Sequence, residues 1–253
     1  MGEISNVVGI PFNVLNEKEL TGLMHSYVSN DVMNIVYMVS VATLKSVVMM
    51  PTVRDAICKA DVILPAERAI LSRSGKKKER DMVTYESLLY ILRHHNIIKS
   101  VYILGAEQKN TQLFEQILLQ SRKSDITIYG VRSLDEQYSD DSIINEINST
   151  VPDALILAMD SPKLENWIAS HRPKINAKMC IALGDILDVI VKENAEPSAF
   201  IKNIGLEKLY YFIRKKYAES KKNERILNSI LAEYNKKQGS EEHEYSADKE
   251  PFI

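Results

Sequence analysis

A carboxylate between an apolar run and a polar helix start gives this chain its clearest chemical signal. Residues 154–159 form a continuous apolar run of strand length, which is typical of a parallel strand buried on both faces. Asp160 follows the run, and Ser161 and Pro162 are residue types that cap a helix and open its first turn. Free backbone N–H groups at a helix start attract anions, so the junction is a potential anion site. Such junctions recur in α/β domains and most bind nothing, so position alone does not make a site.

Alternating strands and helices predict the architecture that must position this junction. Six short apolar segments are predicted to be strands: 35–39, 62–64, 101–104, 126–129, 155–159 and 179–183. Helices are expected between them, including 17–29, which Asn16 and Glu19 open as a capping box. Alternation of this kind implies an α/β fold, with a mostly parallel, Rossmann-like sheet and helices on both faces.

The C-terminal part of the chain differs from this body. We predict an α/β domain over 1–205, a basic amphipathic helical appendage over 206–238, and an acidic, disordered tail over 239–253. An apolar stripe at helical spacing runs through the appendage and includes Ile226, Leu227, Ile230 and Leu231. The stripe can lie on an anionic membrane, or it can pack on the protein's own core or on a partner subunit.

Composition excludes several classes of protein. The formal charge of −2 over 253 residues argues against a general nucleic-acid binder, which carries a concentrated basic excess. The N-terminal residues do not show the charged-then-apolar pattern of a signal sequence, and no apolar run approaches the roughly 20 residues of a membrane span. We therefore predict a cytoplasmic protein.

No sequence pattern indicates a metal or a cofactor. Cys58 and Cys180 stand in apolar contexts and are predicted to be core residues in a reducing compartment. His94 and His95 are adjacent on a predicted helix, where neighbouring side chains diverge, and no zinc or calcium spacing occurs. Neither a Walker loop nor a Gly-x-Gly-x-x-Gly is present. We predict no metal site and no cofactor.

Five blocks, met in the same order, resemble the WecG/TagA/CpsF family of bacterial glycosyltransferases. They lie at 6–15, 60–65, 102–106, 162–168 and 205–210, and the resemblance runs from about 6 to about 214. Block 162–168 (Pro-Lys-Leu-Glu-Asn-Trp-Ile) resembles the family's Pro-Lys-Gln-Glu-x-Trp-Ile signature. The resemblance implies transfer of an N-acetylated amino sugar, commonly N-acetylmannosamine, from a uridine diphosphate donor to a lipid diphosphate sugar. It also favours membrane contact by the basic appendage.

The chain departs from the family at the positions that carry chemistry. Ala66 stands where the family has an aspartate, the proposed general base for the acceptor hydroxyl, and Glu67 follows it. Neighbours on an extended segment point to opposite sides, so Glu67 reaches the site only if the backbone turns there. Leu164 replaces the signature glutamine and cannot make its hydrogen bonds. The family's Thr-Pro-Asn turn aligns with residues 41–43, and of these three residues only Thr43 has a polar side chain.

Three turns that contain glycines in the family align with residues 66–67, 158–160 and 184–185 of this chain, and each has lost at least one glycine here. Of these positions, only Gly184 is still a glycine, and it is followed by Asp185. The chain has 9 glycines in 253 residues, below the roughly 7% of average proteins. Each added side chain stands where a backbone would otherwise approach a sugar nucleotide closely.

The remaining polar residues supply candidates for both roles. Asp188 stands at a family-like aspartate position, where a structural role competes with a catalytic one. Arg80 lies in a charged stretch typical of a solvated loop, and it and Arg214 are candidate partners for a diphosphate. The catalytic candidates are therefore Glu67 and Asp188. The substrate-binding candidates are Thr43, Arg80, Asp160, Leu164, Gly184, Asp185 and Arg214.

Two functions remain open at this point. The first is a divergent glycosyltransferase of cell-envelope polysaccharide or teichoic acid synthesis, with impaired or altered catalysis, that works at the inner face of the membrane on a UDP-sugar and a lipid-linked diphosphate acceptor. The second is an inactive pseudo-glycosyltransferase that serves as a binding or scaffolding subunit. Its partner would be a second copy of the chain or an active glycosyltransferase. The first requires binding of a nucleotide sugar, and the second does not.

Overall fold

The computed structural model describes residues 3–71, 82–120, 125–133, 139–194 and 220–247, without the side chains of residues 71, 220–222 and 238–247. A six-stranded parallel sheet in the order β4-β3-β8-β7-β5-β6 forms its centre. The strands are β3 (Asn34–Val39), β4 (Val62–Pro65), β5 (Ser100–Gly105), β6 (Thr127–Arg132), β7 (Ala154–Ala158) and β8 (Met179–Ala182). All six predicted strands are therefore confirmed, and so is the α/β fold class.

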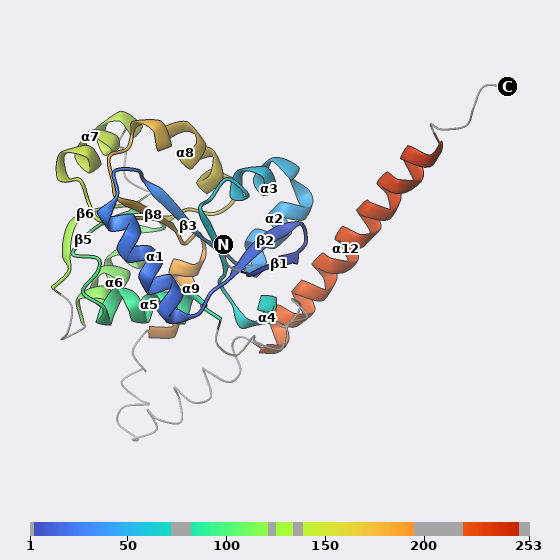
Figure 1. Cartoon of the computed structure of the whole chain (residues 1–253), viewed down its shortest axis with the longest axis horizontal. Coiled ribbons are helices and arrows are strands. Elements are labelled where there is room, and N and C mark those ends of the chain that lie inside the picture. The colour runs from blue at the N-terminus through green and yellow to red at the C-terminus, as the bar shows by residue number, and fades with distance from the viewer. Residues whose placement is uncertain (1–2, 72–81, 121–124, 134–138, 195–219, 248–253) are drawn as a thin grey trace, which may run out of the picture.

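Helices cover both faces of the sheet (Figure 1). One face carries α1 (Glu17–Ser29), α5 (Tyr85–His94), α6 (Gln108–Leu119) and α9 (Ile186–Asn194). The other carries α2 (Val41–Met49), α3 (Pro51–Ile57), α7 (Asp140–Thr150) and α8 (Lys163–His171). Side chains along β3 alternate between the two cores: Val36 and Met38 face the first, and Ile35 and Tyr37 face the second. This two-sided burial explains why the strands read as continuous apolar runs.

A separate antiparallel hairpin, β1 (Glu3–Val7) and β2 (Ile10–Val14), precedes the sheet. Its turn residues Val8 and Gly9 both have positive φ angles, of 56° and 76°, as a tight two-residue hairpin requires. The predicted capping box of α1 is confirmed, because Asn16 Oδ1 accepts from Glu19 N at 3.0 Å and Glu19 Oε2 accepts from Asn16 N at 2.8 Å.

The start of α8 differs from the prediction. No side chain caps this helix, and Pro162 is its N-cap rather than its first residue. The carbonyl oxygen of Asp160 already accepts from Lys163 N at 2.9 Å and from Leu164 N at 3.2 Å. The Ser161 hydroxyl therefore serves another purpose, and it donates to Glu165 Oε1 at 2.6 Å.

The C-terminal helix α12 (Ser220–Ala247) packs on α2 and on α4 (Arg68–Leu71) and then extends away from the domain (Figure 1). Leu227 and Ile230 are buried in the same core as α2, with Ile226 and Leu231 packed against it. Of the alternatives predicted for this stripe, the structure shows packing on the protein's own core for these four residues.

The end of α12 also differs from the predicted boundaries. The helix continues past 238 to Ala247, into the segment expected to be disordered. Residues 239–247 include three glutamates and an alanine, which favour helix, and no proline before Pro251. The other parts of the appendage and tail, 206–219 and 248–253, lie outside the described residues. Among the helices of the described ranges, none is long and apolar enough to cross a membrane.

One of the two cysteines is not a core residue. Cys180 on β8 is buried as predicted, and burial raises the pKa of its thiol to about 12. Cys58 is exposed, because it follows the last residue of α3 and lies off the face that Val53 and Ile57 bury.

Candidate functional site

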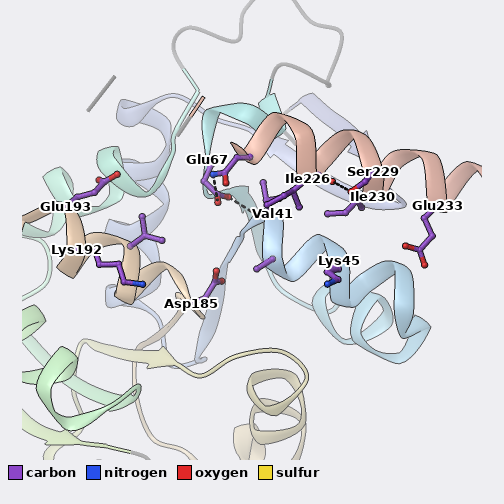
Figure 2. Close-up of a pocket in the computed structure, with 13 residues that line it drawn as sticks. Val41, Lys45, Glu67, Asp185, Lys192, Glu193, Ile226, Ser229, Ile230 and Glu233 are labelled. Carbon is purple, nitrogen blue, oxygen red and sulfur yellow. Dashed lines mark hydrogen bonds between the residues drawn. The ribbon is translucent and has the colours of Figure 1, made fainter. Parts of the chain in front are cut away.

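Two cavities lie along the edge of the sheet where the parallel strands end. The larger, of about 650 Å³, lies between α2, α9 and α12 and is called the α12 cavity below (Figure 2). The smaller, of about 250 Å³, lies beyond the ends of β5, β7 and β8 and is called the strand-end cavity. Asp185 lines both. The carboxyl ends of parallel strands are where α/β folds bind ligands.

Glu67 reaches the α12 cavity, whereas Ala66 does not. Ala66 continues the strand ladder through its N–H to Val39 O at 2.9 Å, and its side chain is fully buried in the first core. Glu67 comes next and lies on the opposite side, lining the cavity. Its Oε2 accepts from Val41 N at 2.9 Å, and its Oε1 accepts from Asn223 Nδ2 at 3.5 Å. The family's base position thus faces the core, and the carboxylate one residue later faces the cavity.

A hydroxyl at the start of α2 holds Asp185. Ser40 is the N-cap of α2, where its Oγ accepts from Thr43 N at 2.9 Å and donates to Asp185 Oδ1 at 2.7 Å. Burial raises the pKa of Asp185, the Ser40 hydrogen bond opposes that rise, and the nearby charge of Asp160 adds to it. Asp185 therefore binds its proton more tightly than an exposed aspartate does.

Thr43 lies behind Ser40 and not in a cavity. It is buried, and its Oγ1 lies 3.0 Å from Ser40 Oγ. Ser40 was missed by the sequence reasoning, although a serine between an apolar strand and a helix start is a recognisable cap.

The strand-end cavity gathers several of the predicted residues. Asp160, Gly184, Asp185 and Asp188 all line it. Gly184 has a φ of 59°, in the left-handed region that favours glycine. Asp188 Oδ1 accepts from Asn110 Nδ2 at 2.8 Å, and this bond joins α9 to α6.

Leu164, like Thr43, lines neither cavity. Leu164 is 1% exposed and belongs to the second core, so an apolar residue suits its position. Arg80 and Arg214 lie outside the described residues. The α12 cavity instead brings in three residues that the sequence reasoning missed: Lys45 on α2, Lys192 on α9 and Asn223 on α12. The only signal for the lysines was a basic residue in the helix that follows a strand end, which is too common to be informative.

Within the described ranges, no three histidine, cysteine or acidic side chains are placed to hold a metal ion. His95, one of the adjacent histidines, has its Nε2 3.4 Å from Glu17 Oε1.

A sequence model of the glycosyl transferase WecG/TagA/CpsF family matches residues 5–218. The chain belongs to this family. The match begins within β1, covers the whole six-stranded sheet and ends before α12. It confirms the resemblance seen in the five sequence blocks.

A curated relative agrees with this membership. The chain is similar to an N-acetylglucosaminyldiphosphoundecaprenol N-acetyl-beta-D-mannosaminyltransferase of Staphylococcus aureus (strain MRSA252), with 24% identity over 115 residues. That alignment covers 44% of this chain and 43% of the relative, so less than half of the relative's length is matched. Among solved structures, an extracellular ligand-binding receptor from Rhodopseudomonas palustris HaA2 matches at 15% identity over 89% of this chain and 72% of its own, with a TM-score of 0.29. That TM-score is too low to bear on fold or function.

Proposed function

We propose that this chain is a divergent glycosyltransferase of cell-envelope polysaccharide or teichoic acid synthesis, and that Glu67 is its general base. It transfers an N-acetylhexosamine from a UDP-sugar to a lipid-linked diphosphate acceptor. Family membership supports the reaction class. The single observation that carries the role of Glu67 is its position: its carboxylate lines the α12 cavity at the residue directly after the family's base position, Ala66, which faces the core.

The reaction needs one proton acceptor beside the attacking hydroxyl. The acceptor oxygen bonds to the anomeric carbon of the donor sugar, the bond from that carbon to the diphosphate oxygen breaks, and UDP leaves with the electron pair. Glu67 takes the hydroxyl proton. A carboxylate oxygen is a hydrogen-bond acceptor and a suitable general base for a hydroxyl group, and the Glu67 carboxylate lines the cavity.

Asp185 is the second carboxylate of the same cavity, and we propose that it binds sugar hydroxyls. Its Oδ1 accepts from Ser40, which fixes the side chain and leaves Oδ2 to accept from a ligand. Hydroxyl groups are suitable partners for a carboxylate here, whereas a diphosphate beside Asp185 needs a cationic partner to offset the repulsion between the two negative charges.

A second function is supported by the residues that the family site has lost. Leu164 offers no hydrogen bond where the family has glutamine, and Ala158, Met159 and Asp160 replace a glycine-containing turn. A chain with these changes can serve as an inactive binding or scaffolding subunit. Its partner would be a second copy or an active glycosyltransferase.

Calorimetric titration with UDP and UDP-N-acetylhexosamines separates the two functions. Micromolar binding supports the transferase, whereas no heat up to millimolar ligand supports the inactive subunit. A transfer assay with a lipid diphosphate N-acetylglucosamine acceptor then tests the base.

We expect Glu67→Gln to lower the transfer rate by about 10²- to 10⁴-fold and to leave UDP binding unchanged. Glu224→Gln is the matched control, because Glu224 is exposed on the same helix as Asn223 and lines neither cavity. Full transfer by Glu67→Gln would remove Glu67 from the mechanism.

A further inference from the structure

We propose that Lys45 and Lys192 bind the diphosphate group of a substrate in the α12 cavity. The choice of a diphosphate rests on the proposed function, and the choice of these two lysines rests on the geometry of the cavity. Both side chains line it, Lys45 from α2 and Lys192 from α9.

The carboxylates around this cavity each have a hydrogen-bond or ion-pair partner in the protein. Glu67 accepts from Val41 N at 2.9 Å, and Asp185 accepts from Ser40 Oγ at 2.7 Å. Glu193 Oε2 accepts from the Tyr85 hydroxyl at 2.5 Å. Glu233 Oε1 lies 3.8 Å from the Lys237 ammonium group. The negative charges of the cavity wall are thus already hydrogen-bonded or paired.

The two lysines differ from the carboxylates in this respect. In the part of the chain that the structure describes, neither Lys45 nor Lys192 has a hydrogen bond or an ion pair. Each ammonium group carries three N–H donors and no acceptor. The two ammonium groups are therefore cationic donors of the cavity wall that are open to an anionic ligand with several oxygen acceptors.

The placement of the lysines suits a ligand that also meets the carboxylates. Figure 2 shows Lys192 and Lys45 on either side of Asp185, with Glu67 beside the start of α2. A diphosphate bound by the lysines would leave the attached sugar near Asp185 and Glu67, and carboxylate oxygens accept from hydroxyl groups. A sugar diphosphate carries both kinds of group, so one ligand can satisfy both parts of the wall.

The test measures binding and does not depend on turnover. Inorganic diphosphate, UDP, uridine and a short-chain lipid diphosphate N-acetylglucosamine are titrated against the full chain at low salt, where charge interactions are least screened. We expect Lys45→Ala and Lys192→Ala each to weaken inorganic diphosphate and UDP by about tenfold, and the double variant by about a hundredfold. Uridine, which has no phosphate, should bind equally to all variants.

Controls separate local from global effects. Both lysines are exposed on helix surfaces, so the variants should keep the wild-type melting temperature. Lys18→Ala is the matched control, since Lys18 is an exposed helical lysine of α1 that lines neither cavity. Lys45→Arg and Lys192→Arg keep the charge and should keep most of the affinity.

Each outcome decides the proposal. If the lysine variants lose only UDP binding, the lysines bind the donor. If they lose only lipid diphosphate binding, the lysines bind the acceptor. Wild-type affinity for diphosphate in the double variant, or no diphosphate binding by the wild type, overturns the lysine assignment. If diphosphate binding depends on the lysines but no sugar is transferred, the lysine assignment stands and the transferase function is refuted. If sugar is transferred equally well without the lysines, the transferase function stands and the lysine assignment is refuted.

Discussion

Replacing Leu227 by alanine should release α12 from the domain without unfolding the sheet. Leu227 is fully buried and Ile230 is 3% exposed, and these two side chains are the deepest contacts of the helix with the second core. Burying a leucine or isoleucine side chain is worth about 1.5–3 kcal/mol, so the pair contributes about 3–6 kcal/mol to docking. A leucine-to-alanine change at a buried site costs about 2–5 kcal/mol.

We place Leu227→Ala at about 2–3 kcal/mol, the low end of this range, because a helix at the domain surface can shift to fill part of the space. That energy raises the undocked population by roughly 30- to 150-fold. Hydrogen exchange measured by mass spectrometry should show amides of α12 exchanging faster by this factor, with β7 and β8 unchanged. Exposed Glu224→Ala is the control. Equal acceleration in α12 and in the sheet would show that the helix does not open by itself, and unchanged exchange in α12 would refute its docking through Leu227.

Two further changes test the strand ends. Gly105→Ala should destabilise the fold by more than about 2 kcal/mol in chemical denaturation. The reason is that Gly105 has a φ of 107° and that an added Cβ would lie 2.5 Å from the carbonyl oxygen of Ala158. A loss of stability below about 1 kcal/mol, which is the cost of the backbone change alone, would contradict that contact. The folded state raises the pKa of Asp185, so the wild-type protein loses stability as Asp185 ionises above pH 3.8, the ordinary pKa of the group. Asp185→Asn removes this ionisation, and its free energy of unfolding should therefore rise relative to wild type as the pH increases above 3.8. A stability difference that is constant from pH 3 to pH 8, a range chosen to span that ionisation, would contradict the raised pKa.

The sheet could be predicted from the sequence because its signals are local. A parallel strand covered on both faces must be apolar throughout, and residues 154–159 carry that pattern within a single short segment. The capping box of Asn16 and Glu19 is equally local, since each side chain bonds to the backbone N–H of the other residue, three positions away.

What could not be predicted depends on contacts between distant residues. The stripe containing Leu227 indicated an apolar partner, but only the folded domain decides that the partner is its own core. Whether Glu67 faces the site depended on a hydrogen bond to Val41, which is 26 residues away. Lys45 and Lys192 lie on helices that follow different strands, and only the strand order brings them to one cavity.

The position of Asp185 in the walls of both cavities links their occupancy. A ligand that bonds to this carboxylate from the strand-end cavity alters its charge and orientation for a ligand in the α12 cavity, and the converse holds as well. Thermodynamic linkage requires the two effects to be equal in free energy. Two small molecules that never touch each other would then bind cooperatively or competitively through one side chain, and Ser40, which fixes that side chain, would set the strength of the coupling.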